Sequence, residues 1–170
     1  MNLTDFITLQ DKELKAQLLK LCHCEAWAES VIRNLKALKT KDVNQEDIED
    51  ILGEEWDTIS ETSKLQAFSA HPKIGDLNVL REKLSSQANT EQGQIRHAKE
   101  STIHQLAEKN DIYYKKFGFI FIICAKGKPA EKMLHHLNNR LKNTRNQEIE
   151  NAATEQKKIF LLRFNDYINS

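Results

Sequence analysis

The stretch SAHPKIGDL, residues 69–77, carries the first side chain that could do chemistry. His71 can give or take a proton near neutral pH, because the unperturbed pKa of imidazole is about 6.5. Pro72 disfavours the α conformation for the residue before it, so we expect His71 just beyond a helix end, on stiff extended backbone. Such a position could aim the imidazole into a cleft. The same segment also fits a helix terminator that contains an incidental histidine.

A second candidate lies in NTEQ, residues 89–92, which has the pattern of a helix start. Asn89 would cap this helix, with Gln92 as its capping-box partner. A carboxylate at Glu91 would complement the helix dipole, which is a purely structural role. Because the N–H groups of a helix start also bind anions, Glu91 is at the same time a candidate base or hydrogen-bond anchor for a ligand.

Arg163 is the third candidate and lies in KKIFLLRFNDYI, four residues after Ile159 and three after Phe160. This spacing places it on an apolar helix face, so we expect the guanidinium to be buried. A buried guanidinium needs a partner, which would be a carboxylate of the protein or of a ligand. A structural salt bridge and a ligand clamp both meet this requirement.

Two groups of residues could instead hold a metal ion. His97, Glu100 and His104 share one helix face, but they lack the HExxH pattern and a second set of ligands, so a solvated face is the simpler interpretation. Cys22 and Cys24 in CHCE have no second Cys/His pair at zinc-finger spacing, which favours ordinary buried thiols. Three cysteines cannot all pair within one chain, so we expect them to be reduced.

The elements that position these residues are predicted to be helices. Only two prolines and five glycines occur, which favours a helical globular protein. Apolar spacing and capping residues predict an all-α fold of about seven or eight helices in a single domain, residues 1–170. We place them within 11–22, around 27–38, from Asn44 to Gly53, after Ser60, from Asn89 to about Lys109, from Asn110 to near Gly118, from Pro129, and over about 146–168, with 78–84 as a further short candidate.

The run FGFIFIICAKGK, residues 117–128, departs from this helical pattern. It is apolar, rich in aromatic and β-branched residues, and bounded by glycines. Periodicity alone cannot separate a strand from a buried helix over so short a run. A buried irregular or extended segment and the start of a core helix are therefore both open.

Charge and hydropathy narrow the class of protein. Lys plus Arg and Asp plus Glu number 25 each, which argues against a partner such as nucleic acid or an anionic membrane. No window approaches the roughly 18 apolar residues of a membrane span. The stretch MNLTDFITLQDKE lacks a basic region followed by an apolar core, so we expect no secretory signal and a cytoplasmic protein.

Taken together, these segments resemble the 2-oxo-4-hydroxy-4-carboxy-5-ureidoimidazoline (OHCU) decarboxylase family. The matching pieces occur in the family's order: CEAWAE, AFSAHPKIGD, EQGQ, NDIYYKKFGFIFIICAKGK, LNNRLKNTRNQEIENAATEQKKI and LLRF. The resemblance implies an all-helical, commonly homodimeric enzyme without cofactor or metal. It implies the conversion of OHCU to (S)-allantoin and carbon dioxide in uric acid degradation.

The resemblance also implies site residues. His71 would be the catalytic acid, with Glu91 and Arg163 completing the catalytic set. The substrate-binding residues it implies are Pro72, Ala88, Glu91, Gln92, Phe121, Ile122, Ile123, Cys124 and Ala125. Ala88 stands where the family often has serine, and Ile120 stands where it often has proline. The first change would remove one substrate hydrogen bond, worth roughly 0.5–1.5 kcal/mol.

Two other functions remain open from the sequence. The chain could be a non-catalytic helical interaction module that has kept the fold. It could also be a metal hydrolase that uses His97, Glu100 and His104. In the decarboxylase interpretation the substrate supplies its own electron sink, so the protein has only to orient it, stabilise the developing charge and deliver a proton.

Overall fold

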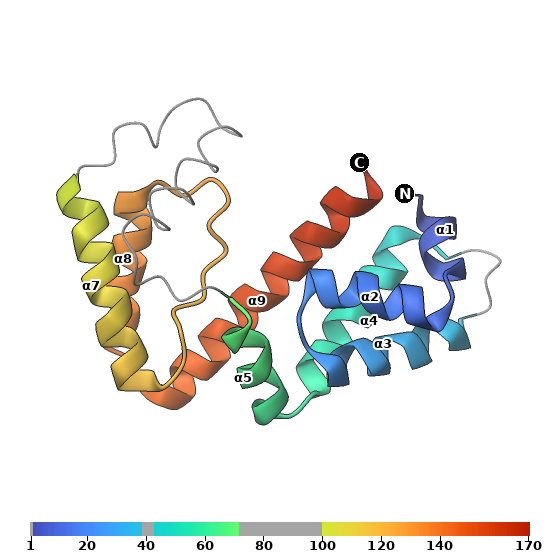
Figure 1. Cartoon of the computed structure of the whole chain (residues 1–170), viewed down its shortest axis with the longest axis horizontal. Coiled ribbons are helices and arrows are strands. Elements are labelled where there is room, and N and C mark those ends of the chain that lie inside the picture. The colour runs from blue at the N-terminus through green and yellow to red at the C-terminus, as the bar shows by residue number, and fades with distance from the viewer. Residues whose placement is uncertain (1, 39–42, 72–99) are drawn as a thin grey trace. The chain divides into compact units, whose positions relative to one another are not determined.

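The computed structural model describes residues 2–38, 43–71 and 100–170. These residues contain helices and no strand, which confirms the all-α prediction (Figure 1). The helices are α1 (Leu3–Thr8), α2 (Asp11–Leu21), α3 (Glu25–Ala37), α4 (Gln45–Thr58), α5 (Glu61–Ser69), α7 (Glu100–Phe117), α8 (Ala130–Arg140) and α9 (Arg145–Ile168). Within the described ranges, no helix is both long and apolar enough to cross a membrane.

The chain falls into two compact units. Unit 1 comprises Met1–Ala70 and Ala153–Ser170, and unit 2 comprises His71–Ala152. Helix α9 therefore contributes its first turns to unit 2 and its remaining length to unit 1. The prediction of a single domain over 1–170 stays a prediction.

Unit 1 is built around aromatic side chains. Helix α3 packs against α2, α4 and α5, and the α9 residues Phe160 and Phe164 are fully buried. The ring centroid of Phe160 lies 4.9 Å from that of Trp27 and 5.7 Å from that of Trp56. Both indole N–H groups donate to backbone carbonyls, so burial leaves neither donor unsatisfied.

The predicted helix starts at Asn44 and Ser60 are confirmed. Asn44 forms a capping box with Asp47 at the start of α4, and the Ser60 hydroxyl accepts from the Ser63 N–H at the start of α5. The predicted end of α4 at Gly53 is wrong, because the helix continues to Thr58. Gly53 lies buried in mid-helix, where a Cβ would come within 2.8 Å of Lys157 Cε. The glycine therefore allows close packing against α9 rather than ending the helix.

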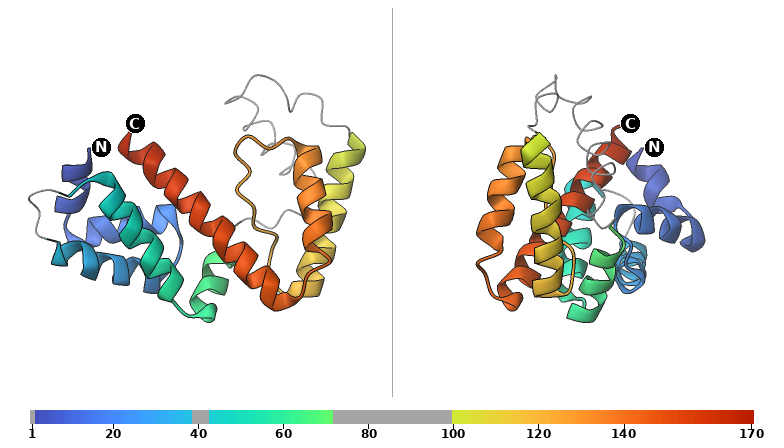
Figure 2. Two further views of the ribbon diagram at one scale, coloured as in Figure 1. Left: turned by 180° about the vertical axis from the view of Figure 1, so that it is seen from behind. Right: turned by 60° about the vertical axis from the view of Figure 1, so that its left-hand side comes forward.

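Unit 2 contains α7 and α8, which lie side by side in every view (Figures 1 and 2). The predicted break at Asn110 is wrong, because α7 runs unbroken from Glu100 to Phe117. Asn110 is buried inside the helix and donates from Nδ2 to the Leu106 carbonyl, 2.8 Å away. This bond to the preceding turn satisfies the amide, so the residue need not act as a cap.

Residues 118–129 of unit 2 lie outside the helices, so the start of a core helix is excluded there. Gly118, with φ +80°, ends α7, and Gly127, with φ +70°, lies in the turn before α8. Pro129 is the N-cap residue of α8. Phe119 and Phe121 are both buried, and their ring centroids lie 5.9 and 5.4 Å from that of Tyr113. Spacing of two residues thus turns both rings toward α7.

One further helix differs from the sequence predictions, and two predicted features are not tested. The short helix α1 was not predicted, although Asn2 caps it through its side chain. The predicted helix at 78–84 and the predicted start at Asn89 lie outside the described residues.

Candidate active site

His71 follows α5 directly, as predicted. The helix ends at Ser69, Ala70 is its C-cap, and His71 lies half-buried at a bend as the first residue of unit 2. The position outside the helix is the one that Pro72 imposes on the residue before it. The candidate site residues Pro72, Ala88, Glu91 and Gln92 lie outside the described residues.

Arg163 lies on α9 in unit 1, and the expectation that it is buried is wrong. The residue is exposed, although its neighbours Phe160 and Phe164 are fully buried. Its Nη1 donates to the carbonyl of Leu21, 2.9 Å away, at the last residue of α2. A cation there complements the negative end of the helix dipole. The partner that the structure shows is therefore a helix end rather than a carboxylate.

The segment 121–125 passes from buried to half-exposed along its length. Phe121 and Ile122 are buried, while Ile123, Cys124 and Ala125 are partly exposed. Three of its carbonyls accept hydrogen bonds from outside the segment. Arg140 Nη1 donates to Ile122 at 2.5 Å, Lys128 Nζ to Cys124 at 2.7 Å, and the Lys128 N–H to Ala125 at 3.0 Å. The protein thus holds this segment at three of its carbonyls, those of Ile122, Cys124 and Ala125.

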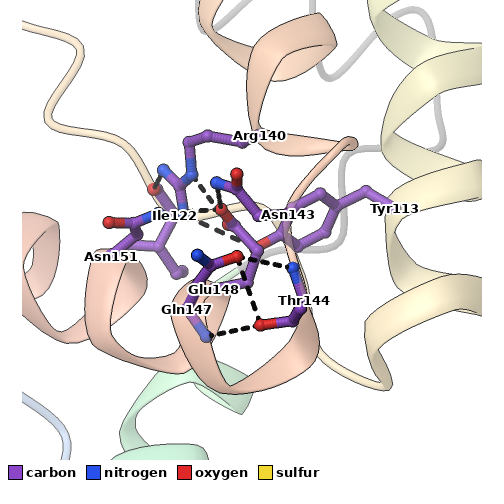
Figure 3. Close-up of polar contacts among 8 residues, drawn as sticks. All are labelled: Tyr113, Ile122, Arg140, Asn143, Thr144, Gln147, Glu148 and Asn151. Carbon is purple, nitrogen blue, oxygen red and sulfur yellow. Dashed lines mark hydrogen bonds and ion pairs between the residues drawn. The ribbon is translucent and has the colours of Figure 1, made fainter.

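The Arg140 side chain belongs to a polar cluster centred on Glu148, whose side chain is fully buried (Figure 3). Arg140 Nε donates to Glu148 Oε2 at 2.8 Å, and the Tyr113 hydroxyl donates to the same oxygen at 2.5 Å. The other oxygen, Oε1, accepts from Asn143 Nδ2 at 2.8 Å and from Asn151 Nδ2 at 2.9 Å. Both oxygens of the buried carboxylate are therefore satisfied, as a buried charge requires.

These contacts set the ionisation of the cluster. Burial alone would raise the pKa of Glu148, but hydrogen bonds from Tyr113, Asn143 and Asn151 and the charge of Arg140 outweigh it and hold the pKa below its ordinary value. Burial, followed by the hydrogen bond to Glu148, raises the pKa of Tyr113. The cluster therefore consists of a carboxylate, a guanidinium and a neutral phenol at neutral pH.

The start of α9 places Glu148 in this cluster. The Gln147 N–H donates to Thr144 Oγ1 at 3.3 Å, and the Thr144 N–H donates to Gln147 Oε1 at 2.9 Å, which is a capping-box arrangement. The sequence analysis did not identify Glu148 as the centre of a buried polar cluster. The signal was its position four residues before Ala152 and eight before Gln156, both buried on α9. An acid on such a stripe needs a partner.

The metal candidates are not assembled by the described residues. Glu100 Oε1 and His104 Nε2 lie 3.5 Å apart on the surface of α7, and His97 is outside the described ranges. Cys22 and Cys24 are buried, and burial raises the pKa of both thiols, whereas a metal ligand must be a thiolate. Within residues 2–38, 43–71 and 100–170, no group of three or more His, Cys, Asp or Glu side chains is arranged to hold a metal.

Comparison with solved structures defines the class of protein. A crystal structure described as OHCU decarboxylase in the presence of (S)-allantoin is 31% identical, has a TM-score of 0.73, and matches over 95% of this chain and 100% of that one. A structure described as (S)-allantoin synthase has a TM-score of 0.75 over 99% of this chain and 54% of that one. At 18% identity the second likeness shows the fold alone. The chain is an all-α protein with the OHCU decarboxylase fold.

The family follows from the sequence match. The family model for OHCU decarboxylase covers residues 8–165, so the chain belongs to the OHCU decarboxylase family.

Relatives with known names agree with this assignment. The "Uric acid degradation bifunctional protein TTL" of Arabidopsis thaliana is 41% identical over 115 residues, which is 64% of this chain and 34% of that protein. The OHCU decarboxylase of Xenopus laevis is 35% identical over 56% of each chain, and that of Amia calva is 31% identical over 74% of this chain and 73% of the relative. The chain thus spans about a third of the plant protein and about half of the frog protein.

Proposed function

We propose that this protein decarboxylates OHCU to (S)-allantoin and carbon dioxide in uric acid degradation. The observation that carries the proposal is the OHCU decarboxylase family match over residues 8–165, which includes His71, the segment 121–125 and Arg163. The relatives named above and the structure determined in the presence of (S)-allantoin support the same activity.

The reaction needs no covalent bond between the protein and the substrate. The bond between the ring carbon and its carboxylate breaks, carbon dioxide leaves, and the electron pair passes into the neighbouring ring double bond. The nitrogen of that double bond and the carbon that bears the ureido group each gain a proton, and the hydroxyl loses one to become the carbonyl of allantoin. Because the substrate accepts the electron pair itself, we propose that catalysis depends on positioning and proton transfer, without a cofactor.

His71 is the proposed acid. Its half-buried position after α5 suits an imidazole that must reach a substrate while remaining oriented. We propose that Glu91 favours the imidazolium form and fixes its orientation, and that protonation from one side yields a single enantiomer. Pro72, Ala88 and Gln92 would complete this part of the site.

Arg163 and the segment 121–125 are the proposed binding groups. The carbonyls of Ile122, Cys124 and Ala125 already accept hydrogen bonds from the protein. We therefore propose that the segment offers backbone N–H groups, which suit an anionic substrate and the charge that develops on it. Arg163 is an exposed residue, and its guanidinium has donors besides Nη1 that could bind a carboxylate.

The working state is a further part of the proposal. On the family resemblance we propose a homodimer that acts in the cytoplasm on this small molecule.

The test uses freshly generated OHCU, monitored by its optical signal and by the chirality of the product. Wild-type protein should accelerate loss of the signal and yield (S)-allantoin, and chelator should have no effect. His71→Ala and Glu91→Ala should nearly abolish product formation while circular dichroism shows a retained fold.

The matched control is His104→Ala, which removes an exposed histidine paired with Glu100 on α7. It should leave turnover unchanged if the enzyme is a decarboxylase of the proposed kind. Loss of activity in His104→Ala and on adding chelator would favour the metal hydrolase. No effect of the wild-type protein on OHCU would favour the non-catalytic module.

A further inference from the structure

We propose that Arg140 is a positioning residue, which holds segment 121–125 in the conformation that binds the substrate. The inference rests on the proposed function, because it takes this segment to be a substrate-binding element. Nothing in the motifs that indicated the family assigned a role to Arg140.

The guanidinium of Arg140 holds two consecutive residues of the segment at once. Nη1 donates to the Ile122 carbonyl at 2.5 Å, and the guanidinium carbon lies 4.6 Å from the ring centroid of Phe121. The first contact fixes the peptide unit and the second fixes the neighbouring side chain. Because consecutive residues are held in different ways, the backbone between them has little freedom to rotate.

Glu148 holds the guanidinium in turn. Arg140 is the last residue of α8, and Glu148 lies in the first turn of α9. The Nε–Oε2 contact of 2.8 Å leaves Nη1 turned toward Ile122, while Nη2 lies 3.4 Å from the Tyr113 hydroxyl (Figure 3). All three guanidinium nitrogens of Arg140 therefore have a hydrogen-bond partner, and the side chain is 11% exposed.

The chemistry of the cluster suits positioning better than stability. A buried ion pair gains little over well-packed apolar side chains of the same volume, because removing both charges from water is costly. What an ion pair adds is direction, since a planar guanidinium satisfies its partners in one geometry. The charged cluster contacts the segment 121–125, and its fixed geometry would keep that segment in the conformation that binds the substrate.

The experiment compares Arg140→Lys with Arg145→Lys. Arg145 is a matched control, because its Nε also donates to a backbone carbonyl of unit 2, that of Phe117 at 3.2 Å, outside the segment. Lysine keeps the charge in both variants and loses the fork. Three readouts are taken well below the melting temperature: hydrogen exchange of 121–125 without ligand, kcat and KM for OHCU, and binding of (S)-allantoin by calorimetry.

Arg140→Lys should speed exchange in 121–125, raise KM, weaken (S)-allantoin binding, and lower kcat/KM by about 10- to 100-fold. The pH dependence that reports His71 should not move, since the acid itself is untouched. Arg145→Lys should match the wild type in exchange within 121–125 and in kinetics.

Unchanged exchange and unchanged kcat/KM in Arg140→Lys would overturn the proposal, even if the melting temperature fell, because the residue would then be purely structural. Equal kinetic losses in both variants would also overturn it. Wild-type protein that leaves OHCU unchanged would instead refute the proposed function. The exchange measurement needs no substrate, so it would still decide whether Arg140 holds the segment.

Discussion

Arg163 shows how one side chain can have a structural contact and a proposed catalytic one. Its Nη1 bond to the Leu21 carbonyl satisfies one of the acceptors that the end of α2 leaves without a helical partner. The remaining donors of the guanidinium belong to an exposed residue. The two roles can be separated. The contact with the Leu21 carbonyl needs one donor and a positive charge, whereas binding a substrate carboxylate needs the paired N–H groups of the guanidinium.

We expect Arg163→Lys to keep most of the stability and to lose most of the activity. Arg163→Ala should lower the free energy of unfolding by about 0.5–1.5 kcal/mol, the net value of one hydrogen bond. Both variants should lower kcat/KM on OHCU. Urea unfolding and steady-state kinetics on the same samples separate the two effects. A folded Arg163→Ala protein with full activity would show that Arg163 does not bind the substrate.

The placement of a single residue could be predicted from the sequence where it depends on the residues next to it. His71 was placed correctly after a helix because the proline next to it restricts its backbone. The burial of Arg163 was predicted wrongly, since helical spacing does not say how far a residue lies from the centre of a buried stripe. Two partners of Glu148, Arg140 and Tyr113, could not be predicted, because they lie 8 and 35 residues away in sequence.

For the helices too, features set by neighbouring residues were predicted, and features set by packing were not. Caps at Asn44 and Ser60 were predicted because each depends on residues three positions apart. The helix ends predicted at Gly53 and Asn110 were wrong, because packing against other helices overrides the weak preference of either residue to leave a helix. For residues 117–128 a buried irregular segment was one of the alternatives, and the structure shows a non-helical course from Gly118 onward.

Substitution of Gly53 tests whether helix propensity or the close approach of Lys157 has the larger effect on the stability of α4. Gly53→Ala should raise helix propensity by about 1 kcal/mol. The new Cβ would meet Lys157 Cε at 2.8 Å, and Lys157 forms an ion pair with Asp57. Because the end of a lysine is flexible and an exposed ion pair contributes about 0–1 kcal/mol, we expect a net gain in stability of about 0–1 kcal/mol. Urea unfolding measures it.

The control is the same substitution in a Lys157→Ala background. There the added methyl group meets no lysine, so Gly53→Ala should show its full gain of about 1 kcal/mol. A loss of stability in both backgrounds would mean that α4 needs glycine for a reason other than the approach of Lys157.

For the whole molecule, the two units carry different optical reporters. Both tryptophans of the chain, Trp27 and Trp56, lie in unit 1, whereas the Glu148 cluster lies in unit 2. Tryptophan fluorescence therefore follows unit 1, and far-ultraviolet circular dichroism follows the helices of both.

Acid should affect unit 2 through Glu148. The folded-state pKa of Glu148 lies below its unfolded value, so the stabilisation is present in full above the unfolded pKa of about 4.3. It is lost as the pH falls through the lower folded value. We expect helical signal to decrease in that window before tryptophan fluorescence changes, as measured by parallel acid titrations of the wild type.

Glu148→Gln provides the comparison. It should be less stable at pH 7 by on the order of 3 kcal/mol, because Arg140 loses its buried counter-charge. Since the variant lacks this titrating group, its stability should fall less steeply between about pH 5 and pH 3. The same slope in both proteins would show that other carboxylates govern acid unfolding.

The division of the chain also has a consequence for synthesis on the ribosome. Unit 2 is continuous in sequence, whereas unit 1 joins Met1–Ala70 to Ala153–Ser170. The core around Trp27 and Trp56 is filled by Phe160, so α3 and α4 must wait during synthesis for a residue that lies more than 100 positions further along the chain. During that interval the apolar faces of α2, α3 and α4 lack their final partner. The nascent helices α2, α3 and α4 are therefore where we expect chaperones to bind while translation is under way.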